Sequence, residues 1–186
     1  MKRKLFFLFC LLLCLSALSS GTAAFFTSQS TARNVITSGF VEIALEERHQ
    51  NSSGAIVTFP QEGIHGILPG STVSKIVSVK NLGAESWIRV QADCAVTAPD
   101  GTPLSSDVVQ FSPDAETWLQ KDGWYYCRQP IPANSATPVL FDQVQFDPAM
   151  GNAYENCRVV ITLQAQAVQA AHNASAVEDV VGWPSA

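Results

Sequence analysis

The sequence predicts an all-β fold: a single antiparallel β-sandwich with short helical insertions, preceded by a cleaved signal peptide. Short segments that alternate between apolar and polar residues recur along the chain, and Pro, Gly, Asn and Asp cluster between them. Removal of an N-terminal signal leaves roughly 160 residues, which is enough for one domain with a sizeable core. No internal repeat or second domain is visible, so we expect one compact sandwich.

The first residues have the order of an export signal. A basic start at 2–4 precedes an apolar run at 5–15 and a small, polar stretch at 16–24. The apolar run is shorter than the about 20 residues that a membrane-spanning helix needs. Small residues at the −3 and −1 positions predict cleavage between Ala24 and Phe25. We therefore expect a secreted protein, extracellular or at the cell surface, without a membrane anchor after cleavage.

Three parts are expected: a signal peptide at 1–24, an extended N-terminal segment at 25–38 and the sandwich domain at 39–186. Removing the three basic residues of the signal from the 11 Lys and Arg leaves eight against 16 Asp and Glu, a net charge of −8. An acidic chain lacks the positive surface that attracts nucleic acid or anionic lipid. Neither is therefore an expected partner.

Four strands are expected in the first half of the domain. The segments at 71–81 and 85–97 are separated by Asn-Leu-Gly, which predicts an antiparallel hairpin. Lys75 interrupts the apolar face of the first, and Trp87 and Arg89 are expected on the outer face of the second. The expected strands are 41–46, 55–59, 71–81 and 85–97, with a polar loop at 48–54.

The second half is expected to contain another hairpin, at 118–129, which turns at Asp122-Gly123, a favoured pair for a two-residue turn. A long strand at 156–171 follows, with alternate apolar residues from Cys157 to Ala167 facing the core. A short amphipathic helix is expected at 170–181. The remaining expected elements are strands at 108–111 and 139–146 and a helical turn at 148–154.

The 118–129 hairpin is rich in aromatic residues, Trp118, Trp124, Tyr125 and Tyr126. Such a cluster can bind carbohydrate. Hairpin aromatics are more often cross-strand packing partners, which is the interpretation we favour.

Catalytic chemistry is not expected. The histidines His49, His65 and His172 have no partner one helical turn away, so the pattern of a zinc protease is missing. There is no G-x-S-x-G serine elbow and no glycine-rich phosphate loop. The sequence therefore predicts neither an enzyme nor a cofactor or metal site.

Three cysteines remain after signal cleavage: Cys94, Cys127 and Cys157. They can be three small buried hydrophobes, or one bridge with a leftover thiol. If a bridge forms, alternation favours Cys94–Cys157, because both point inward from long strands. Their Cα atoms would have to come within about 7 Å.

The segment at 25–37 is polar and β-branched and lacks proline. If it is extended, one face is apolar at its ends and small in the middle. A frayed terminus is the alternative. The residues that share this face are Phe26, Ser28, Ser30, Ala32 and Ile36.

Seven segments carry a family resemblance that covers nearly the whole chain, weakest between Pro99 and Pro138. They are 21–28 (GTAAFFTS), 34–39 (NVITSG), 41–45 (VEIAL), 68–81 (LPGSTVSKIVSVKN), 146–152 (FDPAMGN), 165–170 (AQAVQA) and 182–184 (GWP). On these motifs the chain resembles the TasA/camelysin family. These are exported Gram-positive proteins processed by a dedicated ER-type signal peptidase, SipW.

The resemblance implies a jelly-roll sandwich and a structural role as a subunit of biofilm-matrix fibres. It also implies that the segment at 25–38 is donated as a strand to a neighbouring subunit, so that the expected partners are further copies of the chain and a SipW-like peptidase during export. Two other functions stay open. One is a monomeric surface module that binds glycan or protein through the 118–126 hairpin, and the other is a secreted metalloprotease, as the camelysin name implies.

Overall fold

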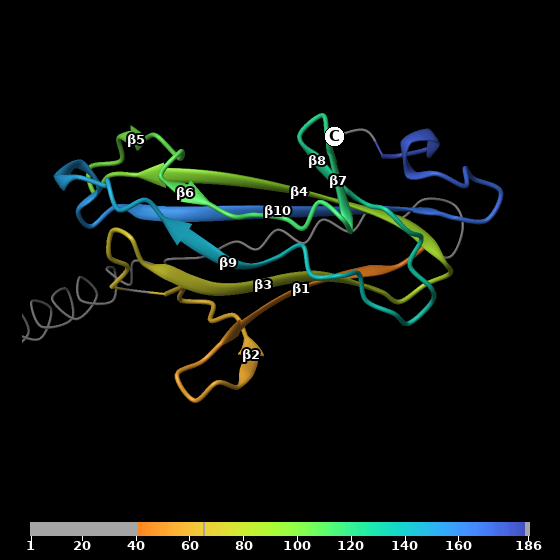
Figure 1. Cartoon of the computed structure of the whole chain (residues 1–186), viewed down its shortest axis with the longest axis horizontal. Coiled ribbons are helices and arrows are strands. Elements are labelled where there is room, and N and C mark those ends of the chain that lie inside the picture. The colour runs from red at the N-terminus through yellow and green to blue at the C-terminus, as the bar shows by residue number, and fades with distance from the viewer. Residues whose placement is uncertain (1–40, 65, 185–186) are drawn as a thin grey trace, which may run out of the picture.

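The computed structural model describes residues 41–64 and 66–184 (Figure 1). These residues form two antiparallel sheets stacked as a sandwich, so the predicted all-β sandwich is confirmed. The helical insertions are two 3₁₀ turns, Asn152–Tyr154 (η1), within the predicted helical turn, and Val177–Asp179 (η2). The expected signal peptide, its cleavage site and the N-terminal extended segment lie outside the described residues.

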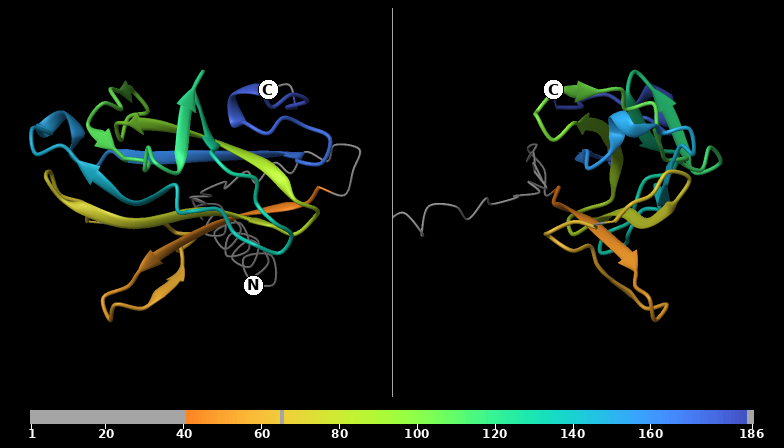
Figure 2. Two further views of the ribbon diagram at one scale, coloured as in Figure 1. Left: turned by 45° about the vertical axis from the view of Figure 1, so that its right-hand side comes forward. Right: turned by 90° about the vertical axis from the view of Figure 1, so that its left-hand side faces the viewer.

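The sheets contain five strands each within the described residues, and every pairing is antiparallel. In spatial order, the first sheet contains β2 (Ile56–Thr58), β1 (Ile43–Gln50), β3 (Thr72–Asn81), β9 (Phe141–Phe146) and β6 (Val109–Gln110). The second contains β10 (Arg158–Gln169), β4 (Ser86–Thr97), β8 (Trp124–Cys127) and β7 (Trp118–Lys121), and β5 (Pro103–Leu104) pairs with β4. Figure 2 shows the two layers and the β1–β2 hairpin that projects from them.

Strands β3 and β4 lie in opposite sheets, so the predicted hairpin between them is wrong. The turn that joins them is a corner between the layers, organised by the fully buried Asn81. Its Nδ2 donates to the carbonyls of Ala84 and Ile131, both at 2.8 Å, and its Oδ1 accepts from the Gly83 N–H at 3.1 Å. Period-two alternation marks a strand's inward face, but it does not show whether the next strand lies beside it or across the core. Strands β9 and β10 also lie in opposite sheets, so the chain changes layers as in a jelly roll.

The core lies between the two sheets. Val77 and Val79 of β3 are fully buried, as are Ile88 and Val90 of β4. Burial of this apolar surface is the main favourable term in folding. The predicted inward residues of the last strand also belong to the core or pack against it: Cys157, Val159, Ile161, Leu163, Ala165 and Ala167.

Lys75, predicted to interrupt the apolar face of β3, is buried and paired. A register shift between Ser74 and Val77 disturbs the ladder at this point. The Lys75 ammonium forms an ion pair with Glu47 on β1 and lies 3.9 Å from the centroid of the Phe59 ring. The carboxylate and the ring face compensate for the loss of water around the charge.

The outer face of the second sheet is covered, contrary to the expectation for Trp87 and Arg89. Both side chains are buried, at 2% and 9% exposure. The chain beyond β10 folds back over this face, and its Val177 and Val180 form a second apolar cluster with Trp87 and Val168 of the sheet. Alternation placed Trp87 and Arg89 on the outer side correctly, but could not show that a later segment covers that side.

The helix expected at 170–181 is not formed. Within this range the chain makes turns and the single 3₁₀ turn η2. The side chain of Asn173 replaces helical hydrogen bonds, because its Nδ2 donates to the carbonyls of Gln169 and Val181 and its Oδ1 accepts from the Val181 N–H. Asparagine often competes with helix formation in this way.

The hairpin turning at Asp122-Gly123 is confirmed by the pairing of β7 with β8. Asp122 and Gly123 have φ of 51° and 78°, the left-handed pair that a type I′ turn requires. Strand β1 continues to Gln50, into the predicted loop at 48–54, because its last residues pair with β2. Among the described residues, no helix is both long and apolar enough to cross a membrane.

Candidate functional site

The outer edge of β10 is the feature most suited to interaction with another chain. This 12-residue strand pairs with β4 along its whole length, from Arg158 opposite Thr97 to Gln169 opposite Ser86. Within residues 41–64 and 66–184, no strand pairs with its other side. In an antiparallel strand, about half of the backbone N–H and C=O groups point away from a given partner. The open side of β10 therefore presents a row of donors and acceptors.

The sequence and ladder of β10 lack the features that usually prevent an edge strand from pairing. Proteins blunt exposed edge strands with prolines, charged side chains, bulges or short length. After Arg158, β10 contains neither a proline nor a charged residue, and its ladder with β4 has no register shift. A long, regular and uncharged edge is a template for another strand.

The other sheet edges in the described part of the chain are short. The first sheet ends in the three-residue β2 on one side, which pairs only with Arg48, His49 and Gln50 of β1, and in the two-residue β6 on the other. The second sheet ends, opposite β10, in the four-residue β7, which carries Lys121 at its end. Among the strands of residues 41–64 and 66–184, only β10 thus offers an open side long enough to pair with a segment of a dozen residues.

The core is less covered at the start of β10 than towards its end. The inward side chains of Val159 and Ile161 are half-buried, whereas Leu163 and Ala165 are buried. Strand β1 approaches β10 from the first sheet, and its Leu45 is also a half-buried residue that packs against the core. Apolar side chains added at this edge would extend an existing core.

The expected inter-subunit residues Phe26, Ser28, Ser30, Ala32 and Ile36 lie outside the described residues, as do Ala24 and Phe25 of the cleavage site. The structure therefore describes the open side of β10 but not the segment that is expected to be donated. The acceptor could have been suspected from sequence, because the stretch from Val159 to Gln169 has no charge or proline. Its position at a sheet edge could not.

The expected Cys94–Cys157 bridge is not compatible with the strand register. Cys94 lies opposite Ile161, four residues from Cys157, which separates the two cysteines by about 13 Å along the ladder. A disulfide requires Cα atoms within about 7 Å. All three cysteines are free thiols, and burial raises the pKa of Cys94 and Cys127. A raised pKa keeps a thiol protonated and weakly nucleophilic.

The aromatic hairpin is mainly a packing element. Trp118 and Trp124 are buried, at 2% and 7% exposure, so neither can stack on a ligand. The indole N–H of Trp118 donates to the Val139 carbonyl at 3.2 Å. The ring of Tyr126 remains half-buried and meets Trp183 of the C-terminal segment edge to face, with centroids 5.5 Å apart. Sequence reasoning missed Trp183 because its contact with the hairpin depends on the return of the chain over the sheet.

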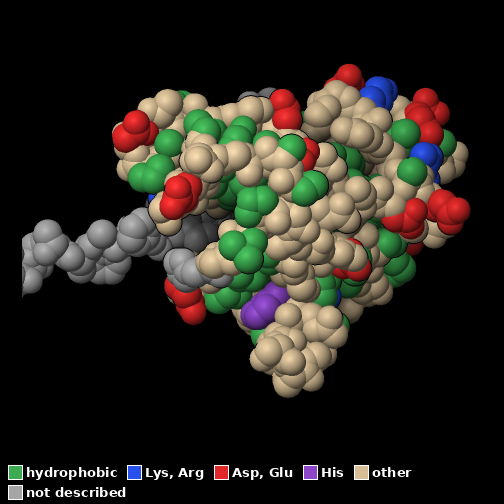
Figure 3. All heavy atoms as spheres, turned by 60° about the vertical axis from the view of Figure 1, so that its left-hand side comes forward, with side chains coloured by type: hydrophobic (Ala, Val, Ile, Leu, Met, Phe, Trp, Pro, Cys, Tyr) green, Lys and Arg blue, Asp and Glu red, His purple; other side chains and the backbone are tan. Residues whose placement is uncertain are grey.

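The two described histidines do not converge on a site. His49 packs against Phe59, with ring centroids 5.8 Å apart, and His172 is exposed; His65 lies outside the described residues. The described residues contain no group of three or more His, Cys, Asp or Glu side chains placed to hold a metal ion. On the face drawn in Figure 3, acidic side chains are spread over the surface and basic ones are few.

Comparisons with protein-family models, with curated proteins and with solved structures found no match for this chain. The fold and the site define its class as an antiparallel β-sandwich with a long, unprotected edge strand in the described part of the chain.

Proposed function

We propose that the protein is a secreted structural subunit of extracellular fibres of the biofilm-matrix kind. The segment at 25–38 of one subunit adds as a strand to the open edge of β10 in the next. The observation that carries this proposal is the 12-residue edge of β10, which has neither a partner strand among the described residues nor the usual protection. Strand addition of this kind takes affinity from backbone hydrogen bonds and register from alternate side chains.

The donor segment suits this edge in length and composition. Residues 25–38 can extend along all of β10, they contain no proline, and Arg33 is their one charged residue. Alternate residues from Phe26 to Ile36 would face the core beside Val159 and Ile161. Small side chains such as Ser30 and Ala32 in the middle of this face, with Phe26 and Ile36 near its ends, would help to set the register of the added strand.

The export signal supports an extracellular site of assembly, because the donor segment begins where the signal ends. Cleavage between Ala24 and Phe25 would free it only outside the cell membrane. On the family resemblance, a SipW-like signal peptidase performs this cut. N-terminal sequencing of the secreted protein should read Phe-Phe-Thr-Ser, and a start beyond Gln29 would remove part of the donor and contradict the proposal.

Negative-stain microscopy of the purified mature protein tests the function. The wild type should form fibres, whereas Ala32→Glu and deletion of 25–33 should give folded, secreted monomers, because a charged side chain cannot enter the core face. Thr31→Glu is the matched control, since Thr31 belongs to the opposite face and should permit assembly. Unchanged fibres from Ala32→Glu would contradict strand donation. An unfolded monomer would show that the segment belongs to its own domain's core.

Neither the tryptophans of the hairpin nor the described histidines favour the two other functions. A binding module built on the tryptophans of the hairpin is opposed by the burial of Trp118 and Trp124. A metalloprotease would need a ligand cluster, and none is found among the described residues. If the wild-type protein stays monomeric under the microscope, both the binding module and the metalloprotease would again have to be tested.

A further inference from the structure

A second site lies on the outer face of the second sheet, around the buried Arg89. Its guanidinium lies 4.1 Å from the ring centroid of Trp124 and 4.8 Å from that of Trp183. Its Nη1 donates to the Tyr126 hydroxyl at 3.0 Å, and its Nη2 donates to the Pro184 carbonyl at 3.1 Å. No carboxylate is among these partners within the described residues.

Arg89 therefore positions two aromatic rings, those of Tyr126 and Trp183. Its guanidinium donates a hydrogen bond to the hydroxyl of Tyr126 and packs against the face of the Trp183 ring. The rings of Tyr126 and Trp183 lie edge to face, with centroids 5.5 Å apart. Gly182, with φ of 83°, provides the left-handed backbone that turns the chain before Trp183. A buried charge is stabilised only by well-formed partners, so these contacts hold both rings in fixed positions.

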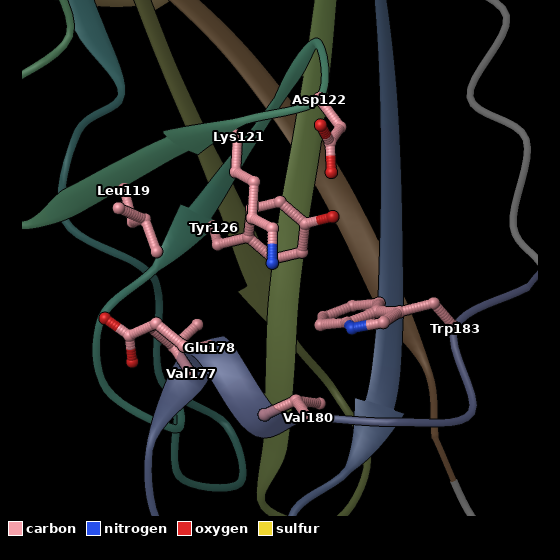
Figure 4. Close-up of a pocket in the computed structure, with 8 residues that line it drawn as sticks. All are labelled: Leu119, Lys121, Asp122, Tyr126, Val177, Glu178, Val180 and Trp183. Atoms are coloured by element: carbon pink, nitrogen blue, oxygen red, sulfur yellow. The ribbon is translucent and has the colours of Figure 1, made fainter.

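A pocket of about 200 Å³ opens in front of these rings. Figure 4 shows Lys121 and Tyr126 from the hairpin and Trp183 from the C-terminal segment pointing towards a common space, with the η2 turn beneath them. The other lining residues are Leu119, Asp122, Val177, Glu178 and Val180. The walls thus combine aromatic rings, aliphatic side chains and charged groups.

The charged groups of the pocket, Lys121, Asp122 and Glu178, are exposed. Among the hydrogen bonds and ion pairs of the described residues, none involves the side chains of Lys121, Asp122 or Glu178. The hydroxyl of Tyr126 accepts from Arg89 and keeps its own hydrogen for another acceptor. Exposed donors and acceptors therefore line the pocket beside the two aromatic rings without bonding to one another.

We propose that this pocket binds one pyranose ring of a polysaccharide. A pyranose has an apolar C–H face that packs on an aromatic ring and a rim of hydroxyls that both donate and accept hydrogen bonds. Asp122 and Glu178 accept from hydroxyls, and Lys121 donates to them. The volume is below the about 300–1,000 Å³ of pockets for drug-sized ligands, which suits a single ring. Two carboxylates against one ammonium disfavour a phosphate group.

Isothermal titration of the mature protein tests the site with soluble hexamers of glucose, N-acetylglucosamine and glucosamine, all β-1,4-linked. The three share the pyranose ring, and comparison of them separates neutral sugars from cationic ones. We expect at least one hexamer to bind. Trp183→Ala and Glu178→Ala should each weaken that binding by about tenfold or more, because an aromatic or charged contact of about 1.4 kcal/mol is lost.

Asp179→Ala is the matched control. Asp179 is exposed, belongs to the same η2 turn and does not line the pocket, so its removal should leave binding unchanged. Glu178→Ala touches none of the Arg89 contacts, so it tests the pocket even if Trp183→Ala loosens the C-terminal segment. Absence of binding to all three hexamers, or binding that Glu178→Ala leaves unchanged, would overturn the proposal.

Discussion

The guanidinium of Arg89 donates two hydrogen bonds to Oε1 of Gln166, at 2.9 and 2.6 Å, across the ladder that joins β4 to β10. The two residues are directly opposite in the register, and both are buried on the outer face of the second sheet. A neutral acceptor and aromatic rings thus take the place of a carboxylate partner. Hydrogen bonds to a charged group contribute about 1.5–3 kcal/mol each, so this contact links the edge strand β10 firmly to the sheet.

Arg89→Lys should destabilise the protein by about 2–3 kcal/mol. Lysine keeps the charge, but it cannot form the two-pronged contact with Gln166 or stack flat against the rings. Urea unfolding followed by circular dichroism gives the free energy of unfolding. Arg128→Lys is the control, because Arg128 is exposed and its Nε donates only to the Ala115 carbonyl among the described contacts. Equal effects of the two substitutions would show that the buried arrangement has no special stability.

Gly123→Ala should destabilise the protein by about 1–2 kcal/mol. An added methyl group meets no atom within 4 Å at this position, so the effect comes from the backbone, which has φ of 78°. Gly151→Ala is the matched control, since Gly151 also has open space but a φ of −89°, which alanine adopts readily. Thermal unfolding of the two variants should separate them. An equal change in both would contradict the type I′ assignment.

Sequence patterns predicted the strands well and their arrangement poorly. The alternation from Val159 to Ala167 correctly identified the inward face of β10, and Asp122-Gly123 correctly identified a turn. The partners of β3 and β4 were wrong because the corner at Asn81 depends on a carbonyl from Ile131, which is distant in sequence. The same limit applies to both candidate sites, because an open edge and a pocket arise only when distant segments meet.

All three cysteines should be found as free thiols in the secreted protein. The register places Cys94 opposite Ile161, too far from Cys157 for a bridge. Peptide mapping by mass spectrometry, with alkylation and without reduction, checks this expectation. A recovered Cys94–Cys157 peptide would show that the register between β4 and β10 is wrong.

Stability should fall as the pH rises above about 9. Burial raises the pKa of Cys94 and Cys127 in the folded protein above the ordinary value of 9.0. As the pH rises, the thiols therefore lose their protons in the unfolded chain before they do so in the folded protein. The contribution of the buried thiols to the free energy of unfolding is present below pH 9 and is lost above it. Urea unfolding at pH 8 and pH 10 should show a smaller loss in the Cys94→Ala, Cys127→Ala double variant than in the wild type. An equal loss in both would mean that other groups cause it.

Hydrogen exchange tests the proposed assembly most directly. The comparison is between fibres of the mature wild-type protein and the Ala32→Glu variant, read by mass spectrometry on peptides that cover 158–169. Addition of a strand satisfies the outward backbone groups of β10, so its amides should exchange much more slowly in fibres than in the variant, while peptides from β2 and β6 change little. Equal exchange across β10 in the two samples, with new protection at another edge, would contradict donation of the N-terminal strand to β10.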